Sequence, residues 1–391
     1  MANVSSSNGL EKRPKLRFPG FDEPWQTTLL SSVFAKNTQK NTDGRITNVI
    51  CNSAKQGLIP QREYFDKDIA NSDNTNGYYI IEENDFVYNP RKSSDAPYGP
   101  ISSYKYTEAG IVSPLYLCFR AKKEINPAFF EWYFRSSAWH RYVYMSGDSG
   151  ARHDRVSIKD DTFFAMPINI PSAHEQAQIA NFLERIEQRI EMQRALVDSL
   201  KKYKRGAIAH ILSGKNKEFS STSSWMQKTL GDLCSEFRSG RNISSTLIHK
   251  TGDYPVYGGN GIRGYCDQYS HEGEYVVIGR QGALCGNVRI IQGQNYLSEH
   301  AIAVRANADN DTGFLLYLLD FMKLGQYSDQ GAQPGLAVNK LLRLKCTVPN
   351  KKTQSKIASF LLRLDSQISN QEKMLSVLAY QREAFLQQLF I

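Results

Sequence analysis

Two long stretches of the chain alternate apolar and polar residues with the period of a helix, and they do so in the same way. Residues 171–212 and 349–390 align without a gap when one is shifted by 178 positions. In both, apolar residues recur every seven positions on two interleaved seams, which is typical of a coiled coil. The pattern predicts two helices, each roughly 60 Å long at ~1.5 Å rise per residue. A repeat of this period indicates two large modules, each of which ends in one long helix.

The two copies share their predicted packing positions. These are Ile179, Leu183, Ile186, Ile190, Val197, Leu200, Ile357, Leu361, Leu364, Ile368, Leu375 and Leu378. Polar residues interrupt the seams at matching places, Gln193 with Gln371 and Lys204 with Arg382. Either these residues fix the register of a helix pair, or they lie near the exposed edge of an ordinary bundle. The heptad pattern leaves both interpretations open.

The stretches that precede the helices are rich in short strand-like runs between Gly-rich turns. In the second stretch we expect strands at 254–257, 275–278, 288–291 and 301–304, a helix at about 312–324, a loop at 329–335 and a last strand at 344–348. The first stretch follows the same order, with a helix at 127–144, a loop at 148–154 and a last strand at 162–170. Trp25 and Trp225 open the two stretches in similar settings. The chain is therefore predicted to divide into an N-terminal segment 1–24, a module 25–170, a helix 171–214, a linker 215–224, a module 225–348 and a helix 349–391.

Composition and charge add limits to this picture. The chain has 391 residues, room for two to three domains, and a net charge of +9. Segments 171–224 and 349–391 each carry +3, whereas the two modules are nearly neutral. A basic balance is compatible with a nucleic-acid partner but is weak evidence for one. No run of 18 apolar residues occurs and the N-terminus is polar, so we expect a cytoplasmic protein without a membrane span.

Motifs for chemistry are missing or out of context. Residues 259–264 match G-x-G-x-x-G, but they lead into a strand-like run, whereas a dinucleotide fingerprint must lead into a helix. The sequence has no P-loop, no H-E-x-x-H and no Asn/Asp-Pro-Pro-aromatic tetrapeptide of amino-methyltransferases. The six cysteines form no C-x-x-C, so reduced thiols and no metal site are expected. We therefore expect a chain without catalytic residues or a cofactor of its own.

What remains is a set of polar and basic side chains in predicted loops, of the kinds that contact DNA. Arg and Lys suit guanine edges and phosphates, and Asn and Gln suit adenine. For any single residue, a solvated loop charge is the more common explanation. The candidates are Lys40, Arg45, Lys55, Arg91, Lys92, Ser93, Arg152, His153 and Arg155 in the first module and Ser239, Arg241, Asn242, Arg263, Arg280, Gln281 and Gln333 in the second.

Taken together, the chain resembles a specificity (S) subunit of a type I restriction–modification system, over nearly its whole length. The residues that carry the resemblance are 14–21 with Trp25, 254–262, 279–288, 299–301, 331–334 and the repeats at 171–212 and 349–390. The resemblance implies an α/β (α+β) fold, with two β-rich target-recognition domains joined by two long antiparallel coiled-coil spacer helices in pseudo-twofold symmetry. The first module matches less well, as expected where each domain reads its own DNA sequence.

The resemblance also implies a function. Each domain would read one half of a bipartite, asymmetric target in double-stranded DNA, and the helices would set the spacing between the halves. The subunit would be non-catalytic and would carry two modification subunits that methylate adenine with S-adenosylmethionine. Restriction subunits that use ATP and Mg would complete the complex. Whether segment 1–24 packs against the end of the second helix is left open by the sequence.

Two other classes remain. The chain could be an adaptor or scaffold with two ligand-binding modules and a coiled-coil helix pair, unrelated to DNA. Salt-dependent, sequence-selective DNA binding would separate the two classes. A stand-alone enzyme is disfavoured by the missing motifs, and turnover by the purified chain alone would revive it.

Overall fold

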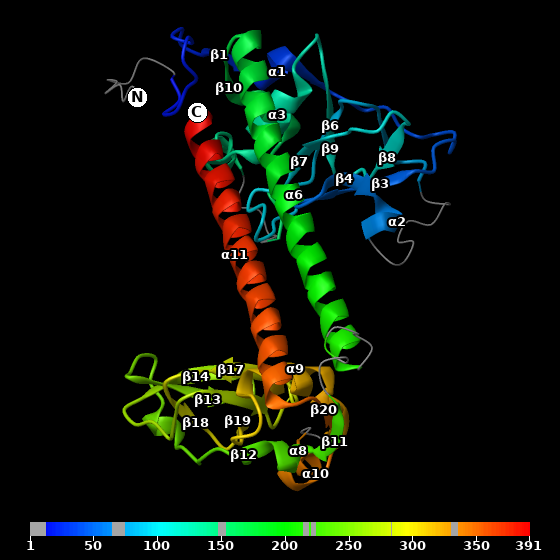
Figure 1. Ribbon diagram of the computed structural model, residues 1–391. Coiled ribbons are helices and arrows are strands. Elements are labelled where there is room, and N and C mark those ends of the chain that lie inside the picture. The colour runs from blue at the N-terminus through cyan, green and yellow to red at the C-terminus, as the bar shows by residue number, and fades with distance from the viewer. Residues whose placement is uncertain are drawn as a thin grey trace. The chain divides into compact units, whose positions relative to one another are not determined.

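The computed structural model describes residues 13–64, 75–147, 154–213, 219, 224–282, 284–329 and 335–391. The chain forms two compact units, unit 1 with Met1–Met192 and Leu375–Ile391, and unit 2 with Gln193–Met374. The long helices α6 (Ala173–Leu212) and α11 (Lys351–Leu389) each contribute one part to each unit (Figure 1). The boundaries of the six segments expected from the sequence stay predictions.

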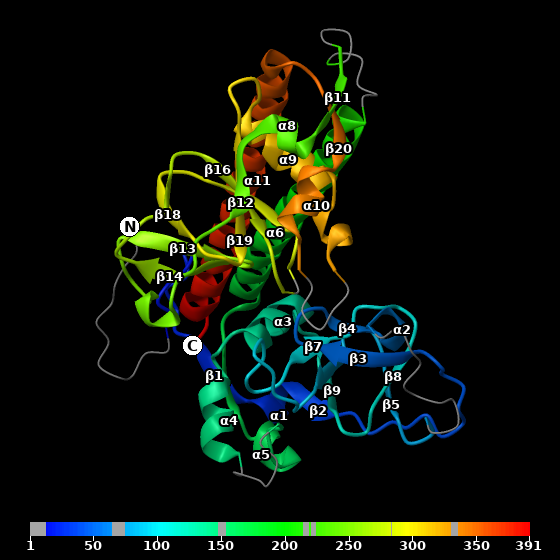
Figure 2. The ribbon, with the colours of Figure 1, turned by 90° about the horizontal axis from the view of Figure 1, so that it is seen from below.

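Unit 1 contains short strands and helices around two four-stranded sheets. The strands are β1 (Gln26–Leu29), β2 (Phe34–Lys36), β3 (Val49–Ser53), β4 (Gly57–Pro60), β5 (Tyr79–Ile81), β6 (Phe86–Tyr88), β7 (Ile101–Ser103), β8 (Gly110–Val112), β9 (Leu117–Ala121) and β10 (Pro167–Ile170). The helices besides α6 and α11 are α1 (Leu30–Val33), α2 (Gln61–Tyr64), α3 (Pro127–Arg135), α4 (His140–Ser146) and α5 (Asp160–Phe164). The sheet orders are β2-β9-β6-β7 and β4-β3-β8-β5, with β1-β10 as a separate pair. The strands of the second sheet can be followed in Figure 2.

Unit 2 repeats this plan. Its strands are β11 (Met226–Thr229), β12 (Cys234–Ser239), β13 (Tyr254–Gly258), β14 (Gly261–Cys266), β15 (His271–Glu272), β16 (Tyr275–Gly279), β17 (Val288–Ile291), β18 (Gln294–Leu297), β19 (Ala301–Ala306) and β20 (Lys345–Val348). Its helices are α8 (Leu230–Leu233), η2 (Ser245–Leu247), α9 (Thr312–Phe321), η3 (Leu324–Tyr327) and α10 (Val338–Leu342). The sheet orders are β12-β19-β16-β17 and β14-β13-β18-β15, with the pair β11-β20. Each described strand thus has a counterpart whose number is ten higher.

The helix that covers the first sheet begins in the same way in both units. In α3, the side chain of Asn126 accepts the backbone N–H of Phe129 at 3.0 Å and Pro127 occupies the first turn. In α9, the side chain of Asp311 accepts the N–H of Phe314 at 2.8 Å. A side-chain cap of this kind satisfies a donor that the helix leaves free, and Pro suits the first turn because its missing N–H is not needed there. The caps fix where each helix starts against its sheet.

The cores under these helices differ in composition. In unit 1, aromatic residues dominate, and the ring centroid of Phe34 lies 5.1–5.4 Å from those of Phe86, Phe119 and Phe130. In unit 2, the equivalent sheet buries aliphatic side chains such as Val276, Ile278, Ile302 and Val304. Burial of each such side chain stabilises the fold by roughly 1.5–3 kcal/mol. The two units therefore share one arrangement of strands, whose core is mainly aromatic in unit 1 and aliphatic in unit 2.

The helices α6 and α11 run antiparallel in each unit. In unit 1, Phe182 packs on Phe385, and Glu187 accepts Arg382 Nη1 at 2.9 Å. In unit 2, Lys204 pairs with Asp365, whose other oxygen accepts the hydroxyl of Tyr317 at 2.7 Å. Residues that come later in α6 thus meet residues that come earlier in α11, as an antiparallel pair requires. The expected fold class is confirmed by this pairing together with the two sheet-rich units.

The polar interruptions of the seams are paired rather than exposed. Gln193 Nε2 donates to Gln371 Oε1 at 2.7 Å, and these two residues occupy the same place in the repeat. Adding 178 to Glu187 gives Asp365, and adding 178 to Lys204 gives Arg382. The ion pair of unit 1 is therefore repeated in unit 2. In unit 1 the acidic residue lies on α6 and the basic residue on α11, and in unit 2 the basic residue lies on α6 and the acidic residue on α11. These contacts favour the interpretation that the polar positions fix the register.

Most of the packing positions that the sequence predicts are buried. The exceptions are Ile186, Leu200 and Leu375, which are half-buried. The others are Ile179, Leu183, Ile190, Val197, Ile357, Leu361, Leu364, Ile368 and Leu378.

Two expected elements were wrong in detail. The helix expected at 127–144 is broken between α3 and α4, where Ser136 Oγ donates to the carbonyl of Tyr133 at 2.7 Å. Trp139 is buried at this break, and its indole N–H donates to the carbonyl of Phe134 at 2.9 Å. The strand expected at 162–170 begins only at Pro167, because α5 takes up the residues before it. Both errors follow from tertiary contacts that override the local pattern.

The described part of the N-terminal segment packs against the end of α11 in unit 1. The N–H of Leu16 donates to the carbonyl of Gln388 at 3.0 Å, and Phe18 packs on Phe182. Arg17 donates two bonds of 2.8 Å to the carboxylate of Glu175, which is only 1% exposed. The question that the sequence left open is thus answered, since residues 16–18 join the two long helices at this end.

Candidate nucleic-acid interface

Three basic candidates of unit 1 lie on separate exposed turns. The backbone of Lys40 forms a bridge with Tyr79. Arg45 is 85% exposed and pairs with Asp43, and Lys55 is 75% exposed and pairs with Asp95. Exposed ion pairs of this kind contribute little to stability, so the side chains are free to exchange partners. Their placement suits phosphate contacts or solvent equally.

The structure brings together four other candidates that are distant in sequence. Arg91 and Arg155 form an antiparallel bridge, and the N–H of Lys92 donates to the carbonyl of Asp154 at 2.8 Å. Ser93 follows in the same exposed loop, where its hydroxyl accepts the N–H of Ala96 at 3.1 Å. The loop that leaves β6 is thereby joined to the segment that precedes α5.

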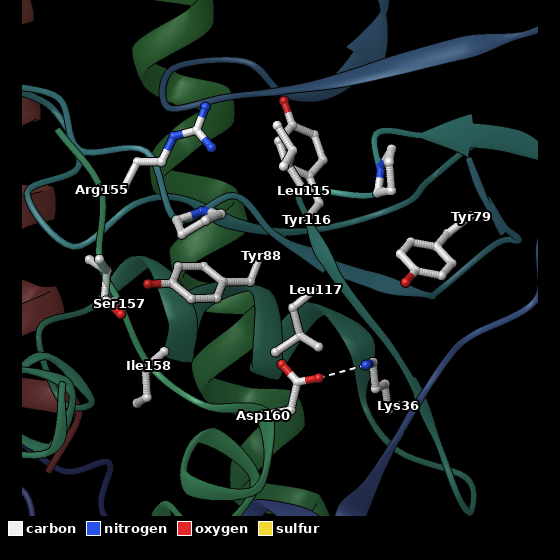
Figure 3. Close-up of a pocket in the computed structure, with 13 residues that line it drawn as sticks. Lys36, Tyr79, Tyr88, Leu115, Tyr116, Leu117, Arg155, Ser157, Ile158 and Asp160 are labelled. Carbon is white, nitrogen blue, oxygen red and sulfur yellow. Dashed lines mark hydrogen bonds and ion pairs between the residues drawn. The ribbon is translucent and has the colours of Figure 1, made fainter. Parts of the chain in front are cut away.

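A pocket of about 450 Å³ opens beside this junction. Figure 3 shows Arg155 and Ser157 on one side of it and Tyr79 and Lys36 on the other. Lys36 donates to Asp160 at 2.5 Å, and this hydrogen bond raises the pKa of the lysine. Tyr116 also lines the pocket, and burial raises the pKa of its hydroxyl. Lys36, Asp160 and Tyr116 were not among the candidates, because nothing in the sequence places them near Arg155.

Arg155 lines this pocket and carries a buried polar atom without a partner among the described residues. Its Nε is buried and has no hydrogen-bond partner within the part of the chain that the structure describes. An unpaired buried donor costs roughly 1–3 kcal/mol, so such groups are uncommon unless a ligand completes them. The Lys36–Asp160 pair is satisfied internally and does not supply the missing acceptor.

The equivalent place in unit 2 holds a connected set of polar side chains. Gln281 Oε1 accepts the Nδ1–H of His300 at 2.6 Å, and His300 Nε2 lies 3.0 Å from Glu299 Oε1. Arg280 Nη1 donates to the backbone carbonyl of Glu299 at 3.3 Å. The sequence named Arg280 and Gln281 as candidates, and it gave 299–301 only as part of the family resemblance.

Glycine allows the backbone to close up beneath this set. A Cβ on Gly259 would lie 2.6 Å from the carbonyl oxygen of Gln281, and one on Gly279 would lie 2.3 Å from that of Gly259. Only glycine fits such an approach. The G-x-G-x-x-G match therefore serves backbone packing, and it leads into β14, a strand, as the sequence predicted.

Hydrogen bonds show that the two places are equivalent. In unit 1 the N–H of Val156 donates to the carbonyl of Pro90 at 2.8 Å, and in unit 2 that of Leu336 donates to the carbonyl of Arg280 at 2.9 Å. The two carbonyls also lie at matching places after their strands. Pro90 lies two residues beyond the end of β6, and Arg280 lies two residues beyond Ile278, the last residue of β16 that pairs with β17, through Val288. We call this place the reading corner. It comprises 90–93, 113–116 and 154–157 in unit 1, and 280–281, 298–300 and 335–336 in unit 2.

The remaining candidates of unit 2 lie away from its reading corner or are held by backbone contacts. The N–H of Arg241 donates to the carbonyl of Leu297 at 2.8 Å, and the carbonyl of Asn242 accepts the hydroxyl of Tyr296 at 2.9 Å. Arg263 is exposed on β14, and Ser239 ends β12. Arg152, His153 and Gln333 lie outside the described residues.

The described ranges also bear on metal sites and membrane spans. Among them, no three His, Cys, Asp or Glu side chains gather in a way that could hold a metal ion. No described helix combines the length and the apolar character that a membrane span requires.

Comparison with known proteins identifies the class. The family model of the type I restriction modification DNA specificity domain matches residues 23–202 and 222–378, which is most of the chain. The chain therefore belongs to this family of specificity subunits, and the resemblance inferred from sequence is confirmed.

Individual relatives agree. The type I restriction enzyme EcoprrI specificity subunit of Escherichia coli is 44% identical over 144 residues, 36% of each chain. A putative type I restriction enzyme specificity subunit of Haemophilus influenzae is 25% identical over 137 residues, which are 34% of this chain and 36% of that one. The matched part thus spans about a third of the length of these curated relatives.

Solved structures match over almost the whole chain. The S subunit of a type I restriction–modification system from M. genitalium has a TM-score of 0.62 at 18% identity, covering 97% of this chain and 99% of that one. The HsdS subunit from Thermoanaerobacter tengcongensis has a TM-score of 0.51 at 16% identity, covering 96% and 97%. At these identities the likeness concerns the fold.

Proposed function

We propose that this chain reads a bipartite DNA target for a type I restriction–modification complex. Unit 1 reads one half of the target, unit 2 reads the other, and the helices α6 and α11 set the distance between them. The observation that carries the proposal is the duplication itself, because one chain holds the same sheet plan twice, each copy with its own antiparallel helix segment. The family match supports the choice of DNA as ligand.

Duplication has a physical advantage for reading a split site. Once one unit is bound, contact by the other becomes intramolecular, so two weak contacts combine into a strong one. The different side chains at the two reading corners suit an asymmetric target, since identical corners would read identical halves. Phosphate contacts by the basic residues would make the affinity fall steeply with salt.

The chemistry is assigned to partner subunits as part of this proposal. Two modification subunits would methylate adenine with S-adenosylmethionine, and restriction subunits would supply ATP- and Mg-dependent cleavage of double-stranded DNA. One solved structure with the same fold, at a TM-score of 0.57 and 14% identity, concerns complex assembly and conformational transition of the type I system. That likeness supports subunit partners of this kind.

The direct test is to produce the chain together with the modification subunit encoded beside it and to map methylated adenines in the host DNA. We expect one interrupted, asymmetric motif. Binding of the purified complex to a duplex carrying that motif should weaken by about 10³-fold or more between 50 and 200 mM salt, if six or more phosphates are contacted. A complex that leaves DNA unmethylated and binds all duplexes equally would favour the adaptor alternative.

The spacing role has its own test. We would duplicate 194–200 in α6 and 364–370 in α11, which face each other in the register of Gln193 and Gln371. Seven residues add about 10 Å and keep the same helix face within ~20°. The gap in the motif should grow by about three base pairs at 3.4 Å each, with the same bases read. An unchanged gap would contradict the spacing role.

A further inference from the structure

The reading corners differ in the one property that matters for recognition, which is the hydrogen-bonding group left without a partner. In unit 1 this group is on the guanidinium of Arg155, whose Nε is buried and unpaired among the described residues. In unit 2 the residue equivalent to Arg155 is Gly335, because the bridges Arg91–Arg155 and Gln281–Gly335 correspond, and the connected set beside Gln281 lies in the same corner. A free group held in place by its surroundings is what selective binding requires, because it loses little freedom when a ligand arrives.

In unit 1 the surroundings of Arg155 favour a flat, electron-rich acceptor. The pocket is lined by the rings of Tyr79, Tyr88 and Tyr116, and the Lys36–Asp160 pair closes one side without neutralising the arginine. The planar guanidinium carries several donors in a fixed arrangement, which matches the two acceptors on the major-groove edge of guanine. A phosphate would need only charge, and the exposed Arg45 and Lys55 offer that without a pocket.

In unit 2 the side chain of Gln281 is exposed but held in one orientation. Its Oε1 is taken by His300, and His300 is held in turn by Glu299, so the amide presents its Nε2 donors outward. Donors of this kind pair with acceptors on a base edge in the major groove. Glu299 is a positioning residue here, since its Oε1 lies 3.0 Å from His300 Nε2 and so holds the ring against Gln281.

From this arrangement we infer that each unit reads its half-site at the reading corner, with Arg155 the specificity-determining side chain of unit 1 and Gln281 that of unit 2. The inference rests on the proposed function and narrows it to two side chains. Arg155 contacts a guanine, and Gln281 contacts a base acceptor in the other half. The bases contacted differ because the two corners present different donors from the same backbone framework.

The test uses the full chain in complex with its modification subunit and maps the methylated motif for single variants. Arg155→Gln should lower discrimination at one guanine of one half-site at least about tenfold and leave the other half-site unchanged. Gln281→Ala should do the same at one position of the opposite half-site. Lys123→Ala and Gln292→Ala are matched controls, because these exposed residues follow the far ends of β9 and β17 from the corners.

Arg155→Lys separates base reading from charge. Lysine keeps the charge but loses the planar fork, so discrimination at the guanine should still fall while overall affinity changes less than in Arg155→Gln. Binding to duplexes with single base pairs replaced in the mapped motif gives the same information for any variant that methylates slowly.

The outcomes are distinguishable. An unchanged motif in both corner variants, with methylation intact, overturns the inference and leaves the proposed function standing. Uniform weakening on every sequence also overturns it, because that is the behaviour of phosphate contacts. Failure of the unaltered chain to direct any methylation would instead overturn the proposed function.

Discussion

Arg120 of unit 1 and Arg305 of unit 2 occupy the same position on the equivalent strands β9 and β19, yet they meet different partners. Arg120 donates to both oxygens of Asp85, at 2.6 and 2.7 Å. In unit 2 the place of Asp85 is taken by Tyr275, over whose ring Arg305 lies at 4.8 Å. The hydroxyl of Tyr275 donates in turn to Glu236 at 2.9 Å. Unit 1 thus has an ion pair with a buried carboxylate at the place where unit 2 has an arginine stacked on a hydrogen-bonded tyrosine.

A second difference between the units lies between the first sheet and the helix that covers it, which is α3 in unit 1 and α9 in unit 2. In unit 1 the buried carboxylate of Glu131 accepts the N–H and the hydroxyl of Ser103, at 2.6 and 2.7 Å. The equivalent positions in unit 2 are Leu316 and Ile290, both apolar. The comparison teaches that the sheet plan tolerates either kind of interior at this place, a hydrogen-bonded polar pair in unit 1 or an apolar pair in unit 2.

The largest expected effect is a loss of stability in unit 1 when the side chain of Asp85 is removed. Asp85 is 1% exposed and also accepts the N–H of Glu82 at 2.9 Å. Asp85→Ala would leave the N–H of Glu82 unpaired and leave Arg120 with only its exposed ion pair to the carboxylate of Glu82, and should lower the free energy of unfolding of unit 1 by about 3 kcal/mol. The matched change in unit 2, Tyr275→Phe, removes one hydrogen bond and should cost about 1 kcal/mol.

Hydrogen exchange followed by mass spectrometry resolves the two units peptide by peptide and is the appropriate measurement. Losses confined to unit 1 for the first variant and to unit 2 for the second are expected. Equal losses for the two variants would mean that the hydrogen bond of Tyr275 contributes as much to the stability of unit 2 as the Asp85–Arg120 ion pair contributes to that of unit 1.

The next effect is a difference in acid sensitivity. Burial lowers the pKa of His140, from its ordinary value of 6.5 to about 4, among the rings of Tyr98 and Trp139. Between these values the unfolded chain binds a proton that the folded one does not, so stability falls as the pH drops from about 6.5 towards 4. At 1.36 kcal/mol per pKa unit, the full loss is on the order of 3 kcal/mol.

In unit 2, burial also lowers the pKa of His271, but the carboxylate of Glu236 at 3.4 Å opposes the shift. We therefore expect unit 1 to lose more protection than unit 2 when hydrogen exchange is compared at pH 7 and pH 5. His140→Phe should remove most of this difference. If the variant keeps the full acid sensitivity, another group in unit 1 is responsible.

The smallest effect concerns the ion pairs that the repeat places in both units. Glu187→Ala removes one partner of Arg382, which keeps its bond to Glu383 at 2.7 Å. Asp365→Ala removes the partner of both Lys204 and Tyr317, and burial already raises the pKa of the tyrosine hydroxyl. We expect a loss of about 1 kcal/mol or less for the first variant and about 2 kcal/mol for the second.

Urea unfolding of the two variants, with hydrogen exchange to assign the affected unit, checks this order. Ser366→Ala serves as a control beside Asp365, since its hydroxyl bonds to the carbonyl of Leu362 in its own helix. A larger loss for Glu187→Ala would contradict the view that the tyrosine makes the unit 2 pair the stronger one.

Much of the framework could be predicted from the sequence because its signals are local. The heptads predicted α6 and α11 to within two residues at each end, and the Gly-rich turns located β13, β16, β17 and β19. The helix break at Ser136 could not be predicted in this way. It depends on the burial of Trp139, which no short window of sequence reveals.

The candidate site was harder to predict, because its residues are distant in the chain. Arg91 and Arg155, or Gln281 and His300, become neighbours only when the sheets close. The sequence offered Arg155 and Gln281 among sixteen candidates and gave no means of choosing between them. Arg155 and Gln281 stand out only in the folded structure, where Arg155 has an unpaired donor and Gln281 is held in one orientation.

The sequence by itself determined the duplication, the two long helices and the absence of a dinucleotide fingerprint in context. These follow from periodicity and from the spacing of glycine and apolar residues, which act over a few positions of the chain. Only the tertiary structure decided that Glu187 meets Arg382, that Asp365 meets Lys204 and that the two reading corners are equivalent. Such contacts depend on strand register and helix direction, and these are set by the packing of the whole unit rather than by any local pattern.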